Sequence, residues 1–113
     1  MTWCAVCPDL ERPVDRVALV APPSLGSGLP ELEPFFPVIV TAHDLARAAG
    51  HTRLVCADND PYCPEGAAAL YGGPLDLPID LHPGAGHLNV DAGYGPWPAI
   101  EAWAQGAKNG VDT

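Results

Sequence analysis

With 113 residues the chain is long enough for one domain, and 14 acidic against five basic residues give it a net charge of -9. A charge of this sign repels the phosphates of nucleic acids and of anionic lipid headgroups, so we expect neither nucleic acid nor a membrane surface as a partner. The apolar runs are far shorter than the roughly 20 residues that span a bilayer, and no basic-then-apolar leader opens the sequence. These features predict a soluble, cytoplasmic protein whose four cysteines are free thiols.

The first half of the sequence predicts one strand, one loop and one helix. Residues 16–21 form an apolar run ended by two prolines, as expected of a strand buried on both faces of a parallel sheet. Residues 24–37 contain three prolines and a Gly-Ser-Gly turn, which predict a loop. Residues 42–49 are helix formers throughout, and Gly50 after them is a suitable C-cap.

The middle of the sequence predicts two further strands with a helix between them. Residues 52–57 form the second strand, which the sequence Asp-Asn-Asp-Pro ends. Residues 64–71 predict a helix with Pro64 near its first turn and two glycines after its end. Residues 77–82 predict a third, shorter strand, in which Pro78 and an aspartate indicate an edge position.

Residues 96–107 predict the last helix, with Pro96 at its first position. Apolar side chains recur along this helix at a spacing of three and four residues, namely Trp97, Ile100, Trp103 and Ala104. Strands that alternate with helices indicate an α/β sandwich of layers. Because sheets of this kind normally have about five or more strands, three parallel strands with flanking helices predict a sheet truncated at its amino-terminal side. Residues 1–113 are therefore interpreted as a single, partial domain.

Two side chains that can act together in catalysis follow the second and the third predicted strand. Asp60 comes just after residues 52–57, and His87 lies in a glycine-rich loop after residues 77–82. Both therefore emerge at the same edge of a parallel sheet, where open α/β folds place their sites. There a carboxylate can fix the tautomer of an imidazole and leave its other nitrogen as a general base. Taken singly, the aspartate is more often a turn or cap residue, and the histidine a surface residue.

Cysteines near the start of the sequence allow two other interpretations. Cys4 and Cys7 follow a tryptophan and imitate the Trp-Cys-x-x-Cys motif of thioredoxin-like redox proteins, but no strand precedes them to deliver the motif. With His43 or His51 they could hold zinc, yet the sequence has no second Cys-x-x-Cys pair. We prefer the interpretation that these cysteines are structural and buried.

A group of oxygen-bearing side chains after the second strand suggests a calcium loop. The residues concerned are Asp58, Asn59, Asp60 and Glu65. Their spacing does not match an EF-hand loop, and its central glycine is missing. Turn and helix-cap roles are preferred, so we expect neither a metal nor another cofactor.

Three blocks of sequence together carry a family resemblance. They are Asn59-Asp60-Pro61-Tyr62-Cys63, Gly86-His87-Leu88-Asn89 and Gly93-Tyr94-Gly95-Pro96-Trp97-Pro98. They resemble the small serine hydrolases of α/β-hydrolase type that include retinoblastoma-binding protein nine and its bacterial relatives. The resemblance implies a three-layer α/β-hydrolase-type sandwich and a small-molecule, ester-like substrate. It also implies that Asp60 is the acid and His87 the base of a Ser-His-Asp triad.

The sequence departs from this family at the nucleophile. Neither Ser24 nor Ser27 lies in the Gly-x-Ser-x-Gly turn that carries the nucleophile of α/β-hydrolases. Residues 1–7 resemble the middle of the helix after that turn, so we expect the first strands, the turn and the oxyanion loop outside this sequence. The chain alone is then an inactive serine hydrolase until the other half completes it. The alternative is a non-catalytic remnant that acts as a protein-interaction module. An open apolar sheet edge also predicts self-association.

Overall fold

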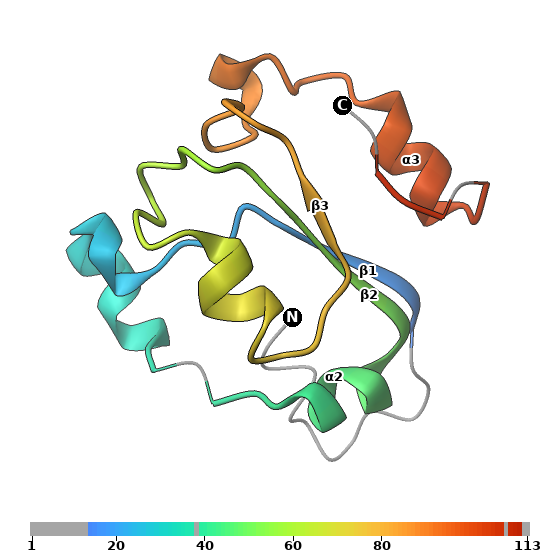
Figure 1. The fold of residues 1–113 in the computed structure, drawn as a ribbon, viewed down its shortest axis with the longest axis horizontal. Coiled ribbons are helices and arrows are strands. Elements are labelled where there is room, and N and C mark those ends of the chain that lie inside the picture. The colour runs from blue at the N-terminus through green and yellow to red at the C-terminus, as the bar shows by residue number, and fades with distance from the viewer. Residues whose placement is uncertain (1–13, 38, 108, 112–113) are drawn as a thin grey trace.

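The computed structural model describes residues 14–37, 39–107 and 109–111. Its centre is one sheet of three parallel strands, β1 (Val14–Val20), β2 (Ala49–Cys56) and β3 (Ile79–Leu81), in the order β1-β2-β3 (Figure 1). All three coincide with predicted strands, and β3 lies at an edge as its proline and aspartate indicated. The predicted parallel α/β fold is therefore confirmed.

The register of the sheet brings the carboxyl ends of the strands together. Val20 of β1 lies beside Val55 of β2, and Cys56 of β2 lies beside Leu81 of β3. The loops that follow β2 and β3 consequently leave the sheet at one edge. This edge carries both predicted site residues.

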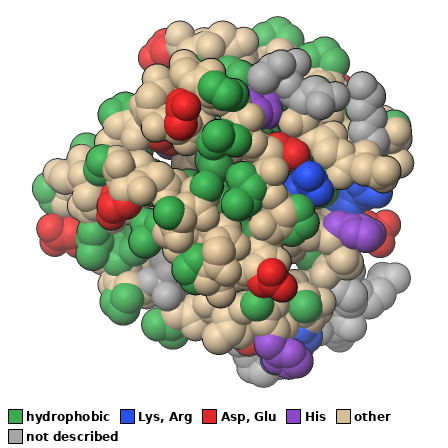
Figure 2. Space-filling model, in the orientation of Figure 1, with side chains coloured by type: hydrophobic (Ala, Val, Ile, Leu, Met, Phe, Trp, Pro, Cys, Tyr) green, Lys and Arg blue, Asp and Glu red, His purple; other side chains and the backbone are tan. Residues whose placement is uncertain are grey.

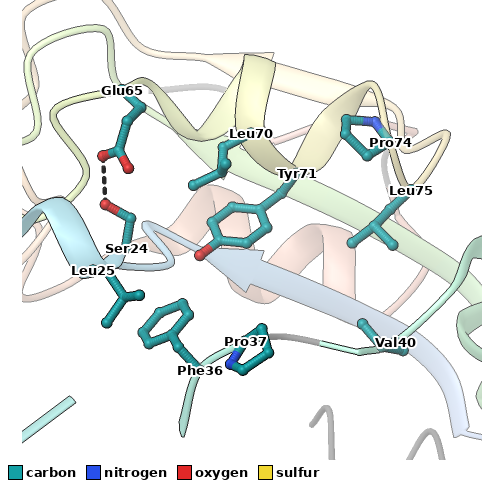
Figure 3. Close-up of a pocket in the computed structure, with 10 residues that line it drawn as sticks. All are labelled: Ser24, Leu25, Phe36, Pro37, Val40, Glu65, Leu70, Tyr71, Pro74 and Leu75. Carbon is teal, nitrogen blue, oxygen red and sulfur yellow. Dashed lines mark hydrogen bonds between the residues drawn. The ribbon is translucent and has the colours of Figure 1, made fainter. Parts of the chain in front are cut away.

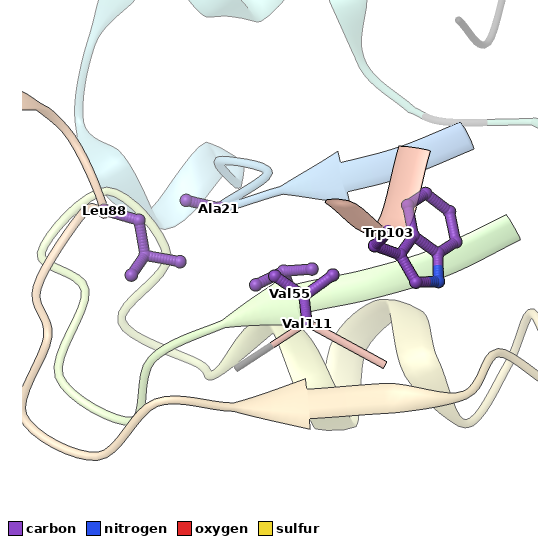
Figure 4. Close-up of a cluster of buried hydrophobic side chains, with 5 residues drawn as sticks. All are labelled: Ala21, Val55, Leu88, Trp103 and Val111. Carbon is purple, nitrogen blue, oxygen red and sulfur yellow. The ribbon is translucent and has the colours of Figure 1, made fainter. Parts of the chain in front are cut away.

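One face of the sheet is covered by helix α3 (Pro98–Ala104) and the loops beside it. Trp103 is almost fully buried there, and Arg16 of β1 lies over its indole ring at 5.2 Å. The buried side chains of this layer come from β2, from α3, from the residues that follow β1 and β3, and from the last described residues (Figure 4): Ala21, Val55, Leu88, Trp103 and Val111.

The opposite face is covered by helix α2 (Ala42–Ala48) and by a π-helical turn, η3 (Ala68–Gly72). Helix α2 begins with a capping box between Thr41 and Asp44, whose side chains each accept the other's backbone N–H. Side chains at alternate positions of β2 point to this face and pack against η3, as Leu54 and Cys56 do. Helices on both faces of the sheet give the three-layer arrangement that was predicted.

The helix predicted over residues 64–71 is wrong in its start and in its type. Turns occupy residues 61–65, and regular hydrogen bonding begins only at η3, which ends at Gly72. The reason is Gly66, whose N–H bonds to the Cys63 carbonyl and whose positive φ of 89° is incompatible with a helix.

Other predicted boundaries also move by a few residues. Gly50 is not a C-cap, because β2 begins at Ala49 directly after α2. Pro98, not Pro96, occupies the first turn of α3, and Ala104 is exposed. The predicted loop over residues 24–37 contains two 3-10 turns, η1 (Leu25–Ser27) and η2 (Pro30–Phe35), and a third, η4 (Val90–Ala92), follows the histidine loop.

Among the described residues, none of the helices has the length and apolar character needed to cross a bilayer. In the space-filling view, hydrophobic side chains gather over the middle of one face, and acidic side chains are spread around them (Figure 2).

Candidate active site

Asp60 lies in a turn that begins four residues after the end of β2 and is almost completely buried, with 6% of its surface exposed. Its Oδ1 atom accepts a hydrogen bond of 2.8 Å from the backbone N–H of Tyr62, and its carbonyl accepts one from Cys63. An aspartate that bonds the N–H two residues on forms an Asx-turn. The turn thus holds the carboxylate rigidly and leaves the Oδ2 atom for another partner.

The loop that carries His87 is fixed to the two residues before Asp60. Gly84 and Gly86 both have positive φ, which lets their N–H groups turn toward the end of β2. The Gly84 N–H donates to Asp58 Oδ1 and the Gly86 N–H to Asn59 Oδ1, each at 2.8 Å. Two consecutive side chains therefore hold the backbone of the histidine loop against the aspartate turn.

These two loops bring Asp60 and His87 into direct contact. The Nδ1 atom of His87 lies 2.8 Å from Oδ2 of Asp60, within the distance that we expected for an acid and base pair. Because a carboxylate only accepts, the proton of a neutral imidazole is assigned to Nδ1, and Nε2 carries the lone pair. Among the described residues Nε2 has no hydrogen-bond partner, and 30% of the side chain is exposed.

Aromatic and apolar neighbours keep the imidazole in place. The ring of Tyr62 lies against His87 with a centroid separation of 4.5 Å. Leu88, the next residue, is buried at 5% exposure in the cluster beneath α3. A general base held on one side by a buried carboxylate, and open on the other, can take a proton from a group that approaches Nε2.

Neither serine of the sequence lies against Nε2. The Ser24 hydroxyl is buried, donates to Glu65 Oε1 at 2.5 Å and accepts from the Gly26 N–H as the N-cap of η1. Ser27 accepts from the N–H of Leu29. Both hydroxyls thus have local structural partners, in agreement with the absence of an elbow sequence around them.

The structure describes two of the four cysteines. Cys56 and Cys63 are buried free thiols, and burial raises the pKa of both, so that they stay protonated near neutral pH. Cys4 and Cys7 lie outside the described residues.

Within the described part of the chain, no group of three or more His, Cys, Asp and Glu side chains is arranged to hold a metal ion. The oxygens of the suggested calcium loop are bonded to the two loops described above or to Ser24.

Several polar residues of structural importance were not identified from the sequence. His82 is buried after β3 and bonds the Val111 carbonyl at 3.0 Å. Asp80 of β3 forms a two-point ion pair with Arg53 of β2 and also accepts the Val111 N–H. A basic residue and an aspartate in neighbouring strands were the only signal for the ion pair. These contacts fasten Val111 to β3 and to the start of the loop that follows it.

The comparisons with known proteins add one finding. A family model described as serine hydrolase matches residues 1–105, which include both members of the Asp60 and His87 pair. Comparison with curated proteins and with solved structures gave no significant match.

Proposed function

We propose that Asp60 and His87 are the acid and the base of a Ser-His-Asp triad for ester-type substrates. The chain belongs to the serine hydrolase family, and this membership is the starting point of the proposal. In this proposal residues outside the present sequence supply the nucleophilic serine. The observation that carries the proposal is the 2.8 Å hydrogen bond between a buried carboxylate and an imidazole whose Nε2 is open.

Each residue has one task in the proposed reaction. Nε2 of His87 takes the hydroxyl proton while the serine oxygen forms a bond to the ester carbonyl carbon and the carbonyl electrons move to its oxygen. The imidazolium then returns the proton to the leaving alcohol as the ester bond breaks. Water repeats both steps on the acyl-serine and releases the acid. Asp60 stabilises the imidazolium through the hydrogen bond that its Oδ2 atom accepts from Nδ1, while the Tyr62 N–H holds its Oδ1 atom.

A first experiment tests the pair in the chain as it is. At a pH at which the His87 imidazole is neutral, nitrogen-15 NMR should find its proton on Nδ1. Asp60→Ala should abolish this preference because the acceptor is lost, whereas Asp76→Ala, which removes an exposed carboxylate from another loop, should leave it unchanged. An Nε2-protonated ring in the unmodified chain would contradict the proposal.

A second experiment tests the missing nucleophile. The isolated chain should not react with a fluorophosphonate probe, since both of its serines have structural roles. Joined to a segment that supplies the preceding strand, the nucleophile turn and the oxyanion loop, it should hydrolyse activated esters. His87→Ala and Asp60→Asn should then each lower turnover ~10³-fold or more, while His43→Ala on the exposed face of α2 should not.

Two outcomes would count against this function. Labelling of Ser24 or Ser27 that is lost in His87→Ala would show that the nucleophile is already present. A completed protein that folds, binds substrate and stays inactive would instead favour the non-catalytic interaction module.

A further inference from the structure

A cavity of about 300 Å³ lies beside η3, between this turn and the segment that contains η1 and η2 (Figure 3). Its walls are mainly apolar and include Leu25, Phe36, Val40, Leu70, Tyr71 and Leu75. Leu25 and Leu70 are 57% and 38% exposed, so the cavity has apolar surface that a bound molecule would cover. A volume of this size is within the range of small-molecule sites.

One end of the cavity carries a fixed negative charge. Glu65 accepts the buried Ser24 hydroxyl through Oε1, which leaves Oε2 available (Figure 3). The hydrogen bond from Ser24 lowers the pKa of Glu65, so its carboxylate is ionised at neutral pH. Among the described residues that line the cavity, Glu65 has the only charged side chain. The cavity therefore presents an apolar body with an anionic end.

The charged end of the cavity is connected to the Asp60 and His87 pair through a single residue. The Ser24 N–H donates to the Tyr62 carbonyl at 2.9 Å, and the Tyr62 ring lies against His87. Tyr62 also donates its own N–H to Asp60. A molecule bound at Glu65 is consequently held next to the loop that positions the acid and the base.

We propose that this cavity binds the apolar part of a small molecule whose ammonium group pairs with Glu65. The substrates of the site would then be esters of apolar compounds that carry an amine. Apolar walls favour a ligand body without charges, and the exposed carboxylate of Glu65 at one end favours an ammonium over a neutral donor and repels an anion. A role of this cavity in ester hydrolysis rests on the proposed function. Binding of a small molecule to the cavity does not.

The test compares two ligands that differ mainly in charge, 4-phenylbutylamine and 4-phenylbutan-1-ol. Each is titrated into the full chain at low salt and followed by proton–nitrogen-15 NMR. Both should shift the amides of Leu70, Tyr71 and Leu75, which line the cavity. The amine should bind roughly fivefold more tightly than the alcohol, and this ratio should fall at high salt.

Three variants locate the interaction. Glu65→Gln keeps an oxygen for Ser24 but removes the charge, so the two ligands should bind equally. Glu101→Gln removes an exposed carboxylate from α3 on the other face of the sheet and should keep the ratio. Leu70→Ala should weaken both ligands by a similar factor, roughly three- to tenfold, because apolar contact is lost.

Equal binding of the two ligands to the unmodified chain would overturn the proposal, as would a preference for the amine that persists in Glu65→Gln. Shifts confined to α3 or to the histidine loop would overturn it as well. Neither ligand has an ester to hydrolyse, so these results do not depend on a nucleophile. If the preference for the amine depends on Glu65 but a completed protein hydrolyses no ester, the proposed function fails and the assignment of the cavity stands.

Discussion

Leu88 offers a sharp test of how the histidine loop is held in place. Its side chain is buried at 5% exposure in the layer beneath α3, yet its φ of 55° lies in the left-handed region that a bulky residue rarely adopts. Truncation to alanine should cost about 2–5 kcal/mol through lost packing and a cavity. Alanine keeps the backbone strain, whereas glycine removes it.

The two truncations can therefore be ranked from the structure. Relief of the left-handed strain is worth about 1–2 kcal/mol, and the extra freedom of glycine in the unfolded chain costs about 0.5–1 kcal/mol. Leu88→Gly should thus be as stable as Leu88→Ala, or more stable by up to about 1.5 kcal/mol. The matched control is Leu45, equally buried but within α2, where glycine should be about 1 kcal/mol less stable than alanine.

Urea unfolding of the four variants, followed by circular dichroism, measures both differences. The predicted result is that glycine is at least as stable as alanine at position 88, but less stable than alanine at position 45. A Leu88→Gly protein less stable than Leu88→Ala by the same amount as at Leu45 would refute the conclusion that Leu88 is held in a strained conformation.

Three further predictions concern other parts of the chain. Asn59→Ala removes the acceptor of the Gly86 N–H and should cost about 0.5–1.5 kcal/mol, and hydrogen exchange should become faster at the Gly86 amide. Burial raises the pKa of Asp80, but its hydrogen bonds from Arg53 and from a backbone N–H outweigh burial and leave the pKa below its usual value. The pair therefore stabilises the chain above about pH 4. That stability is lost as the pH falls through the lowered pKa, and urea unfolding of Asp80→Asn should show a weaker loss in acid. Burial also raises the pKa of Tyr71 to about 12, so stability should fall between about pH 10 and 12, and Tyr71→Phe should reduce this loss in unfolding experiments.

The strands and the pairing of the acid with the histidine could be predicted because both depend on local patterns. An apolar run bounded by prolines or by Asp-Asn-Asp-Pro defines a buried strand without knowledge of its partners. Once the strands are parallel, the residues after each of them must meet at one edge, which is why Asp60 and His87 were expected together. Their roles in catalysis are a separate question, which the experiments above address.

Helix boundaries were less predictable because contacts distant in sequence decide them. Gly50 has the right residue type for a C-cap, but pairing between β1 and β2 draws Ala49 into the strand and leaves no room for a cap. Pro64 favours a helix start, but Gly66 with its positive φ postpones regular structure to η3. In both cases tertiary structure outweighs a local signal of moderate strength.

The charged cavity had no local signal at all, and its geometry explains why. Ser24 and Glu65 belong to loops that follow different strands, and they meet because the Ser24 N–H bonds the Tyr62 carbonyl. A side chain at Gly26 would place its Cβ atom 2.6 Å from Glu65 Oε1, closer than atoms can approach. The glycine that suggested only a flexible turn in the sequence thus leaves room for the carboxylate in the position from which it accepts the Ser24 hydroxyl, and a larger residue would make the Glu65 side chain shift. A glycine that allows another loop to approach closely can be told from one that makes a turn flexible only when the position of that other loop is known.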